Sequence, residues 1–269
     1  MIRARPRAIR SIVATGGAFA TALALSFAAA SSQAADLTAA QVRAIVAHAA
    51  APVDLARKDL SDLDLSNIDL AGANLAGANL FASRLVSSNF RGANLSGANL
   101  NGTWLMGAQF AGANLSGSSM LGLVILGGAV TARPNFAGAN LSGVRMIADL
   151  PNTDLESANL SRARLGVDIR NQGMGQMRTD LSNAKLAGAN LAGADLSRSS
   201  MAFADLRGAN LRGTNFFAVK LAGANLSGAD VADADFTEAD LDGTVFTGAK
   251  GLDAAKGMDK AANRERAVY

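Results

Sequence analysis

The chain has 269 residues, of which 49% are hydrophobic but only 5% aromatic, so its apolar content is mostly Ala and Leu. It contains no Cys and one His, His48, which excludes disulfides, thiolate metal sites and multi-His zinc sites. Catalysis by a Ser–His or Cys–His pair is nearly excluded for the same reason. The formal net charge of +3 suggests a basic surface, until the N-terminal residues are considered separately.

Residues 1–34 have the three regions of a secretory signal peptide. Four Arg within the first ten residues precede an uncharged apolar stretch, 11–30, and small residues follow at the cleavage positions. We predict cleavage near Ala34/Ala35 and a periplasmic or secreted protein. An uncleaved anchor is the alternative, because the stretch is only marginally long enough to span a bilayer. Without the leader, Lys plus Arg falls from 25 to 21 against 22 Asp plus Glu, so the mature chain is near −1 and the basic surface disappears.

A short amphipathic helix is predicted for residues 35–52, with Thr38 as its N-cap and Pro52 as its end. We expect this helix to cover the open end of the core that follows it. His48 lies in the helix without partner ligands, so the sequence indicates no metal site and no cofactor.

From residue 53 to residue 250, a large apolar residue recurs every five positions. Five matches neither the 3.6-residue period of a helix nor the two-residue period of a strand. A helix would rotate every fifth Leu by about 140°, and a strand would turn successive Leu to opposite faces. The period instead requires a chain that turns a corner every five residues and brings each Leu back to a common axis.

The residue two places before each of these apolar positions is small. From Thr179 to Thr244 none is larger than Val. A slim inward position beside a bulky one would fill a narrow tube at close-packed density. These units, such as Ala-Gly-Ala-Asn-Leu at 71–75 and again at 76–80, resemble the pentapeptide-repeat family, whose motif is Ala-(Asp/Asn)-Leu-x-x.

The resemblance implies an all-β fold: a right-handed quadrilateral β-helix with four pentapeptides per coil and the Leu and Ala positions inward. A coil of 20 residues would stack Phe90 on Phe110 and Phe216 on Phe236, and residues 53–250 would make about ten coils. The expected core includes Leu75, Leu80, Phe90, Leu95, Leu100, Phe110, Leu186, Leu191, Leu206, Phe216, Leu226 and Phe236.

Three slips in the five-residue spacing predict seams near 126–135, 147–154 and 166–180. The first and third are one residue over register and the second is one residue short. An inward Leu cannot move by one place and stay inward, so each slip requires a bulge, a loop or a local break. Such loops are either partner contacts or tolerated insertions.

The residue before each inward Leu faces outward and forms four columns, three of which are mainly Asn and Asp and predict structural polar ladders. The fourth column runs Asp64, Arg84, Trp104, Val124 and contains the only Trp of the chain. An exposed Trp beside an Arg is typical of a binding hot spot, so Arg84 and Trp104 are the candidate partner-binding residues. The alternative is sequence drift, without a function, in a column that lies against a seam loop.

Six acidic residues between Asp230 and Asp242 would ring one coil near the C-terminal end of the repeats. A solvated acidic collar is the favoured interpretation, and weak cation binding or a basic partner is the alternative, since no EF-hand spacing occurs. Ala-Lys-Gly-Leu-Asp at 249–253 recurs six residues later as Ala-Lys-Gly-Met-Asp at 255–259, and this change of period predicts a C-terminal cap and tail over residues 251–269. A dimer contact through this tail is the alternative to simple capping.

No catalytic pair, phosphate-binding loop or ligand cluster occurs, so the sequence does not indicate an enzyme. The favoured function is an exported, rigid structural or protein-interaction scaffold in the cell envelope, whose partner is an unidentified protein. Membrane contact is expected only through an uncleaved signal. The resemblance also suggests a DNA-mimicking, gyrase-interacting protein of the quinolone-resistance type, but export and a charge near −1 argue against it. Binding to nucleic acid itself is not expected.

Overall fold

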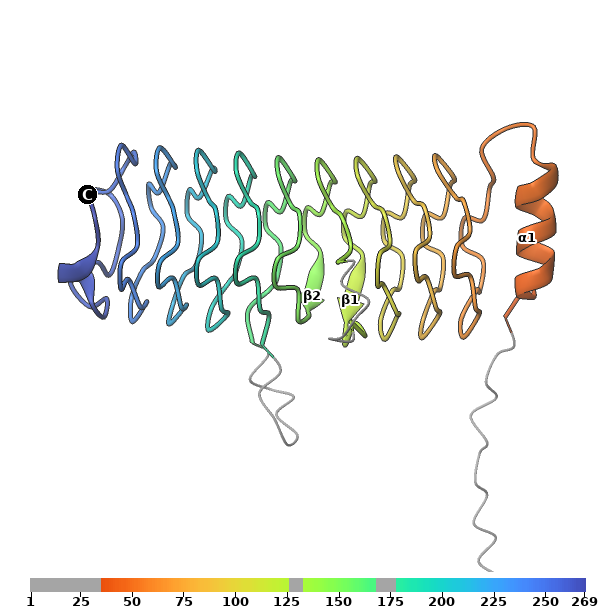
Figure 1. Cartoon of the computed structure of the whole chain (residues 1–269), viewed down its shortest axis with the longest axis horizontal. Coiled ribbons are helices and arrows are strands. Elements are labelled where there is room, and N and C mark those ends of the chain that lie inside the picture. Colours follow the sequence, from red (N-terminus) through yellow and green to blue (C-terminus); the bar gives the residue numbers. More distant parts are fainter. Residues whose placement is uncertain (1–34, 126–132, 168–177) are drawn as a thin grey trace, which may run out of the picture. The chain divides into compact units, whose positions relative to one another are not determined.

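A computed structural model describes residues 35–125, 133–167 and 178–269. The expected leader, 1–34, and the central parts of the first and third seams lie outside these residues. From Asp54 onward the chain forms coils stacked along one axis, each joined to the next by parallel bridges (Figure 1). Each coil has four short straight segments separated by two-residue turns, because the chain turns after every inward Leu.

The bridges define four faces, which we name by their order in the first coil: Asp54, Asp59, Asp64 and Asp69 begin the first, second, third and fourth face. The column of the first face has ten members and therefore counts ten coils. These members are Asp54, Asn74, Asn94, Asn114, Asn140, Asn159, Asn190, Asn210, Asp230 and Lys250. Nine of the coils lie within residues 53–250, where the sequence predicted about ten, and the tenth is formed by residues 250–268, which the sequence assigned to a cap and tail.

The axis is filled by the apolar residues of the five-residue period. All twelve residues of the expected core have no exposed surface. Phe90 and Phe110 stack with ring centroids 5.0 Å apart, and Phe216 and Phe236 stack at 5.1 Å, as a 20-residue coil predicts. Phe136 continues the first stack at 5.1 Å from Phe110, although 26 residues separate the two rings. Extra residues at the first seam therefore leave the core packing unchanged.

The seams change the number of residues in a coil, but each face still continues from one coil to the next. On the fourth face the steps are Gln109 to Asn135, Asn135 to Asp154 and Asp154 to Lys185, or 26, 19 and 31 residues in place of 20. The second seam is neither a bulge nor a loop. Strand β2 (Arg145–Ile147) replaces a turn, so that only four residues separate Met146 from the next inward residue, Leu150.

Strand β2 pairs in parallel with strand β1 (Ser119–Leu121) of the preceding coil. The pairing runs over three residues on each strand, so the backbone stays extended past the inward Met120 and Met146. The shortened unit of the second seam is thus held by a longer strand pair.

Helix α1 (Ala39–His48) packs against the first coil. It is shorter than predicted and ends four residues before Pro52, while its N-cap is Thr38, which forms a capping box with Gln41. Val42 is fully buried and belongs to the apolar core. Arg43 donates to the carbonyls of Asp64 and Ser66, backbone acceptors that face away from the second coil. The helix therefore covers both the apolar end and part of the open backbone edge. No helix in the described ranges has the length and apolar character needed to cross a bilayer.

The tenth coil advances by six residues per face. Its column positions are Lys250, Lys256, Ala262 and Val268, and a short 3-10 helix, η2 (Arg264–Arg266), precedes the last of them. Gly251 follows Lys250, and Gly257 follows Lys256. In the earlier coils, the residue directly after a column position is inward. A Cβ on Gly257 would overlap Thr237 of the ninth coil, and the φ of Gly257 is 69°. The end coil thus approaches its neighbour more closely than a pentapeptide coil does.

Candidate partner-binding face

The first face is an uninterrupted ladder of side-chain amides. From Asn74 to Asn210, each Asn Nδ2 donates to the Oδ1 of the preceding coil, at 3.0 to 3.3 Å, across both long seams. The same Oδ1 atoms accept the backbone N–H two residues further on, as at Ser96 and Ala192. The ladder occupies the polar atoms of this face, so its role is structural, as the sequence predicts.

The third face has no such ladder. Its column is Asp64, Arg84, Trp104, Val124, Asp149, Asp180, Ser200, Lys220, Asp240 and Ala262, and it is the one face of the described coils without an Asn. The Arg84 guanidinium lies over the indole of Trp104, with its Cζ 4.8 Å from the ring centroid. The Nε of Arg84 also lies 3.7 Å from a carboxylate oxygen of Asp64. The two candidate residues are therefore in contact, on successive coils.

Trp104 is partly buried, so the expectation of an exposed Trp was wrong. Arg84 covers one side of the ring and keeps 49% of its own side chain exposed. The cation, and not the indole, is the more accessible member of the pair. A ligand would meet a guanidinium held in place by an aromatic ring, which is a preorganised donor.

The structure adds three rings that the sequence reasoning missed. Phe81 and Phe217 lie at the corner between the second and third faces, and Phe203 lies at the corner between the third and fourth faces. Phe81 is 48% exposed and Phe203 is 66% exposed. With Trp104, these are all the described Phe and Trp side chains of the coils that are outside the core, and all lie on the third face or its borders. The available signal was their position in the turns, where most units have Ala, Gly or Ser.

Phe203 has a left-handed backbone, with a φ of 58°. An aromatic residue in this conformation costs roughly 1–2 kcal/mol. Its ring lies against Gly223 of the next coil so closely that a Cβ there would overlap it. Across the third face, the Arg198 guanidinium lies over the ring of Phe217 with its Cζ 5.2 Å from the centroid. The face therefore carries a second group of rings and cations, in coils seven and eight.

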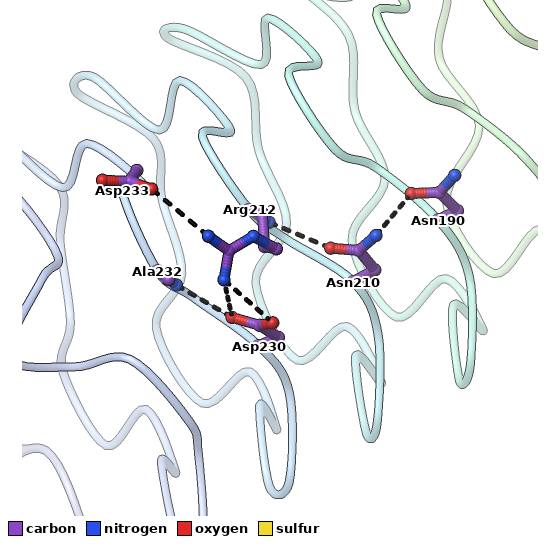
Figure 2. A network of polar contacts seen from close by, with 6 residues as sticks. All are labelled: Asn190, Asn210, Arg212, Asp230, Ala232 and Asp233. Carbon is purple, nitrogen blue, oxygen red and sulfur yellow. Dashed lines mark hydrogen bonds and ion pairs between the residues drawn. The ribbon is translucent and has the colours of Figure 1, made fainter.

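The acidic residues 230–242 ring the ninth coil, but they are not a free collar. Arg212 of the eighth coil pairs with Asp230 at 3.3 Å and with Asp233 at 3.5 Å (Figure 2). On the other side, Arg266 pairs with Asp242 at 2.9 Å. The expectation of a solvated acidic collar is therefore corrected to a band of carboxylates partly neutralised by the coils on either side.

Hydrogen bonds also stabilise the charged form of two of these carboxylates. The backbone N–H of Ala232, and then Arg212, lower the pKa of Asp230 (Figure 2). The hydroxyl and backbone N–H of Thr237 lower the pKa of Asp235, with help from Lys256. Both carboxylates therefore remain ionised and engaged within the fold.

No cluster of three or more His, Cys, Asp or Glu side chains is arranged to hold a metal within the described residues. His48 lies at the end of α1, where its Nδ1 is 2.8 Å from the carbonyl oxygen of Ala44. This contact occupies one of its ring nitrogens.

Among curated proteins, no sequence matches the chain. HetL of Nostoc sp. strain PCC 7120, described as involved in heterocyst differentiation regulation, is 29% identical over 86% of this chain and 94% of its own, with a TM-score of 0.40. A pentapeptide repeat protein of the Arabidopsis thaliana thylakoid lumen is 28% identical over 43% and 67%, with a TM-score of 0.24. QnrB1, a plasmid-mediated fluoroquinolone resistance protein, is 18% identical over 65% and 83%, with a TM-score of 0.36.

The family model for pentapeptide repeats matches eight copies, at residues 59–97, 83–122, 177–213 and 214–250. These matches lie on both sides of the seams and agree with the four-sided coils of the structure. Proteins of this family are generally structural or interaction proteins. The chain belongs to the pentapeptide-repeat family and folds as a right-handed β-helix.

Proposed function

We propose that the chain is an exported, non-catalytic scaffold of the cell envelope that holds a partner protein on its third face. The observation that carries the proposal is the gathering of Phe81, Trp104, Phe203 and Phe217 on this face and its borders. Aromatic residues and Arg are the residue types most enriched in interface hot spots. The first face, by contrast, uses its amides in the ladder and has few free groups to offer.

The two groups of rings set the geometry of the partner. Trp104 lies in the third coil, and Phe203 and Phe217 lie in coils seven and eight. Adjacent coils are spaced by about 4.8 Å, so the groups are roughly 20–24 Å apart. Between them the third face presents Asp149 and Asp180, a pair of acidic positions on successive coils. A partner with basic groups between two apolar contacts would complement this pattern.

Basic residues among the acidic positions of the surface make the DNA-mimicking alternative less well supported. Arg207 pairs with Asp205 at 2.6 Å, and Arg212 occupies the carboxylate of Asp230, so the acidic positions are not presented as a continuous row of charges. Lys220 separates Ser200 from Asp240 on the third face. The signal-like N-terminal residues also favour a location away from a cytoplasmic target.

Export is tested by fractionating cells that express the full chain and sequencing the N-terminus of the product. We expect a periplasmic or secreted species that begins near Ala35. A cytoplasmic species that retains Met1 would contradict the envelope location and would make gyrase protection the next assay.

The binding face is tested by immobilising the purified chain and capturing envelope proteins with it. The Arg84→Ala and Trp104→Ala variants should lose a partner that the native chain retains, because each removes half of the stacked pair. Arg91→Ala is the matched control, since Arg91 is an exposed Arg on the corner between the fourth and first faces. The captured protein is then identified and titrated while the fluorescence of Trp104, the only Trp, is followed. Equal capture by all four proteins would refute the third face as the binding surface.

A further inference from the structure

Three arginines lie on the second face or at its border in coils five and six, away from the aromatic groups. Arg145 and Arg164 are bridge partners in the same column, so their Cα atoms lie on adjacent strands about 4.8 Å apart. Arg162 is at the corner that leads into this face, two residues before Arg164. All three are exposed. Like charges on directly neighbouring strands are destabilising, so this arrangement calls for a counter-charge.

The described residues supply only part of that counter-charge. None of the three arginines forms an ion pair with a described residue. The next position of the column is Asp195, whose Oδ1 accepts from the Asn215 amide at 3.0 Å and from the N–H of Ser197 at 3.0 Å. Asp195 is the direct bridge partner of Arg164 and supplies one acidic group beside three arginines. Among the described residues of this region an excess of positive charge therefore remains.

A shallow hollow lies beside Arg162, at the corner between the first and second faces. It is lined by Ser142, Gly143, Asn159, Ser161, Arg162 and Ala192. The Ser142 and Ser161 side chains sit on successive coils, and neither hydroxyl has a hydrogen-bond partner among the described side chains. Both residues bind the ladder only through their backbone N–H groups. Two hydroxyl donors therefore face the same hollow as a guanidinium.

The backbone directs Arg162 toward this hollow. Its φ of 57° is left-handed, and its Cγ lies 3.9 Å from the position that a Cβ on Gly193 would occupy. The aliphatic part of the side chain is thus held over the next coil, and less rotational freedom remains to be lost when the guanidinium binds.

We propose that Arg145, Arg162 and Arg164, with the hydroxyls of Ser142 and Ser161, form a binding site for a phosphate group. Guanidinium groups bind tetrahedral oxyanions with paired, charge-assisted hydrogen bonds, and Ser hydroxyls donate to the remaining oxygens. The phosphate belongs either to a soluble phosphate compound or to the head group of a phospholipid. The site is separate from the third face and does not depend on the partner proposed there.

The test is calorimetric titration of the purified chain with sodium phosphate, against sodium chloride at equal ionic strength. We expect saturable binding that Arg162→Gln and Arg164→Gln each weaken at least about fivefold. Arg57→Gln is the matched control, because Arg57 occupies the same corner of an earlier coil, has a φ of 60° and is exposed, but neighbours Asp59 and Asn79 on the second face. This variant should bind phosphate as the native chain does.

A second arm distinguishes the two sources. Vesicles of phosphatidylcholine with and without phosphatidylglycerol are sedimented with the native chain, Arg162→Gln and Arg57→Gln. Saturable binding of inorganic phosphate supports a soluble ligand. Binding only to the anionic vesicles, with loss in Arg162→Gln alone, supports a head group. The proposal is overturned if neither probe binds, or if Arg57→Gln weakens binding as much as Arg162→Gln does.

Discussion

The amide of Asn210 is the last side-chain donor of the ladder on the first face, because the next residue of the column, Asp230, has no N–H in its side chain. The Asp230 carboxylate instead accepts from the guanidinium of Arg212 in the preceding coil (Figure 2). At the other end the ladder starts with Asp54, which accepts from Asn74 at 3.0 Å and has no earlier coil to donate to. The ladder is therefore directional: it starts at a carboxylate that only has to accept, and each Asn after it donates to the coil before.

This direction predicts that Asn and Asp are not interchangeable within the ladder. Asn190→Asp removes the donor to Asn159 and places a carboxylate against its Oδ1, so we expect a loss of about 1–3 kcal/mol in the free energy of unfolding. Asp54→Asn is the control, since an amide oxygen can still accept from Asn74, and it should change stability little. Urea unfolding of both variants measures the difference, and equal losses would contradict a directional ladder.

The inward position of Leu206 predicts a large effect of charge in the core. Leu206 has no exposed surface, so Leu206→Asp buries an unpaired carboxylate or forces the neighbouring coils apart. We expect a loss above about 3 kcal/mol or outright unfolding of these coils. Leu206→Met is the control that keeps the volume nearly constant. Thermal unfolding followed by circular dichroism should separate the two, and an unchanged transition for Leu206→Asp would refute the inward assignment.

Two glycines with nearly equal φ values allow the cost of a steric overlap to be distinguished from the cost of backbone strain. Gly257 and Gly228 have φ values of 69° and 68°, but a Cβ on Gly257 would overlap Thr237, whereas a Cβ on Gly228 would meet nothing within 4 Å. Substitution by Ala should therefore cost about 1 kcal/mol at Gly228 and clearly more at Gly257. Melting temperatures of the two variants test this order. A smaller loss at Gly257 would mean that the tenth coil does not approach the ninth as described.

The hydrogen bonds of Asp235 predict that part of the stability depends on pH. Because Thr237 lowers the pKa of Asp235 in the folded chain, its contribution is present above the unfolded pKa of about 4. It is lost as the pH falls below that value through the lower folded pKa. The urea midpoint should therefore fall between pH 6 and pH 3, and it should fall less in Asp235→Asn. An identical fall in the variant would remove this carboxylate from the explanation.

The five-residue period was enough to predict the inward residues and the two Phe stacks, because an inward Leu and a tight turn leave the chain few other paths. It did not predict that residues 250–268 form a further coil, because that coil advances by six residues per face. The period also did not reveal that Leu150 is inward. The step from Met146 to Leu155 is nine residues and contains one unit of four, and a rule of constant spacing cannot distinguish such a unit from a loop. The rings of Phe203 and Phe217 were missed for another reason. They occupy turn positions, where the pattern constrains the backbone and leaves the side chain free.

The pairing of Arg84 with Trp104 followed from the 20-residue coil, but the partial burial of the indole did not. Outward positions depend on the side chains of adjacent coils, and spacing alone does not say how far Arg84 folds over its neighbour. The same limit applies to the acidic residues of the ninth coil. Their counter-charges come from Arg212 and Arg266, which lie in the coils on either side.

The six-residue steps of the tenth coil also decide how copies of the chain can associate. A stack of identical coils ends in an open backbone edge, on which another copy could continue the helix and so start a fibre. Here the terminal path is longer than that of a pentapeptide coil, with Lys250, Lys256, Ala262 and Val268 as its positions, while α1 covers the opposite end. Neither end is a template for the other. The chain consequently has a built-in limit against end-to-end polymerisation.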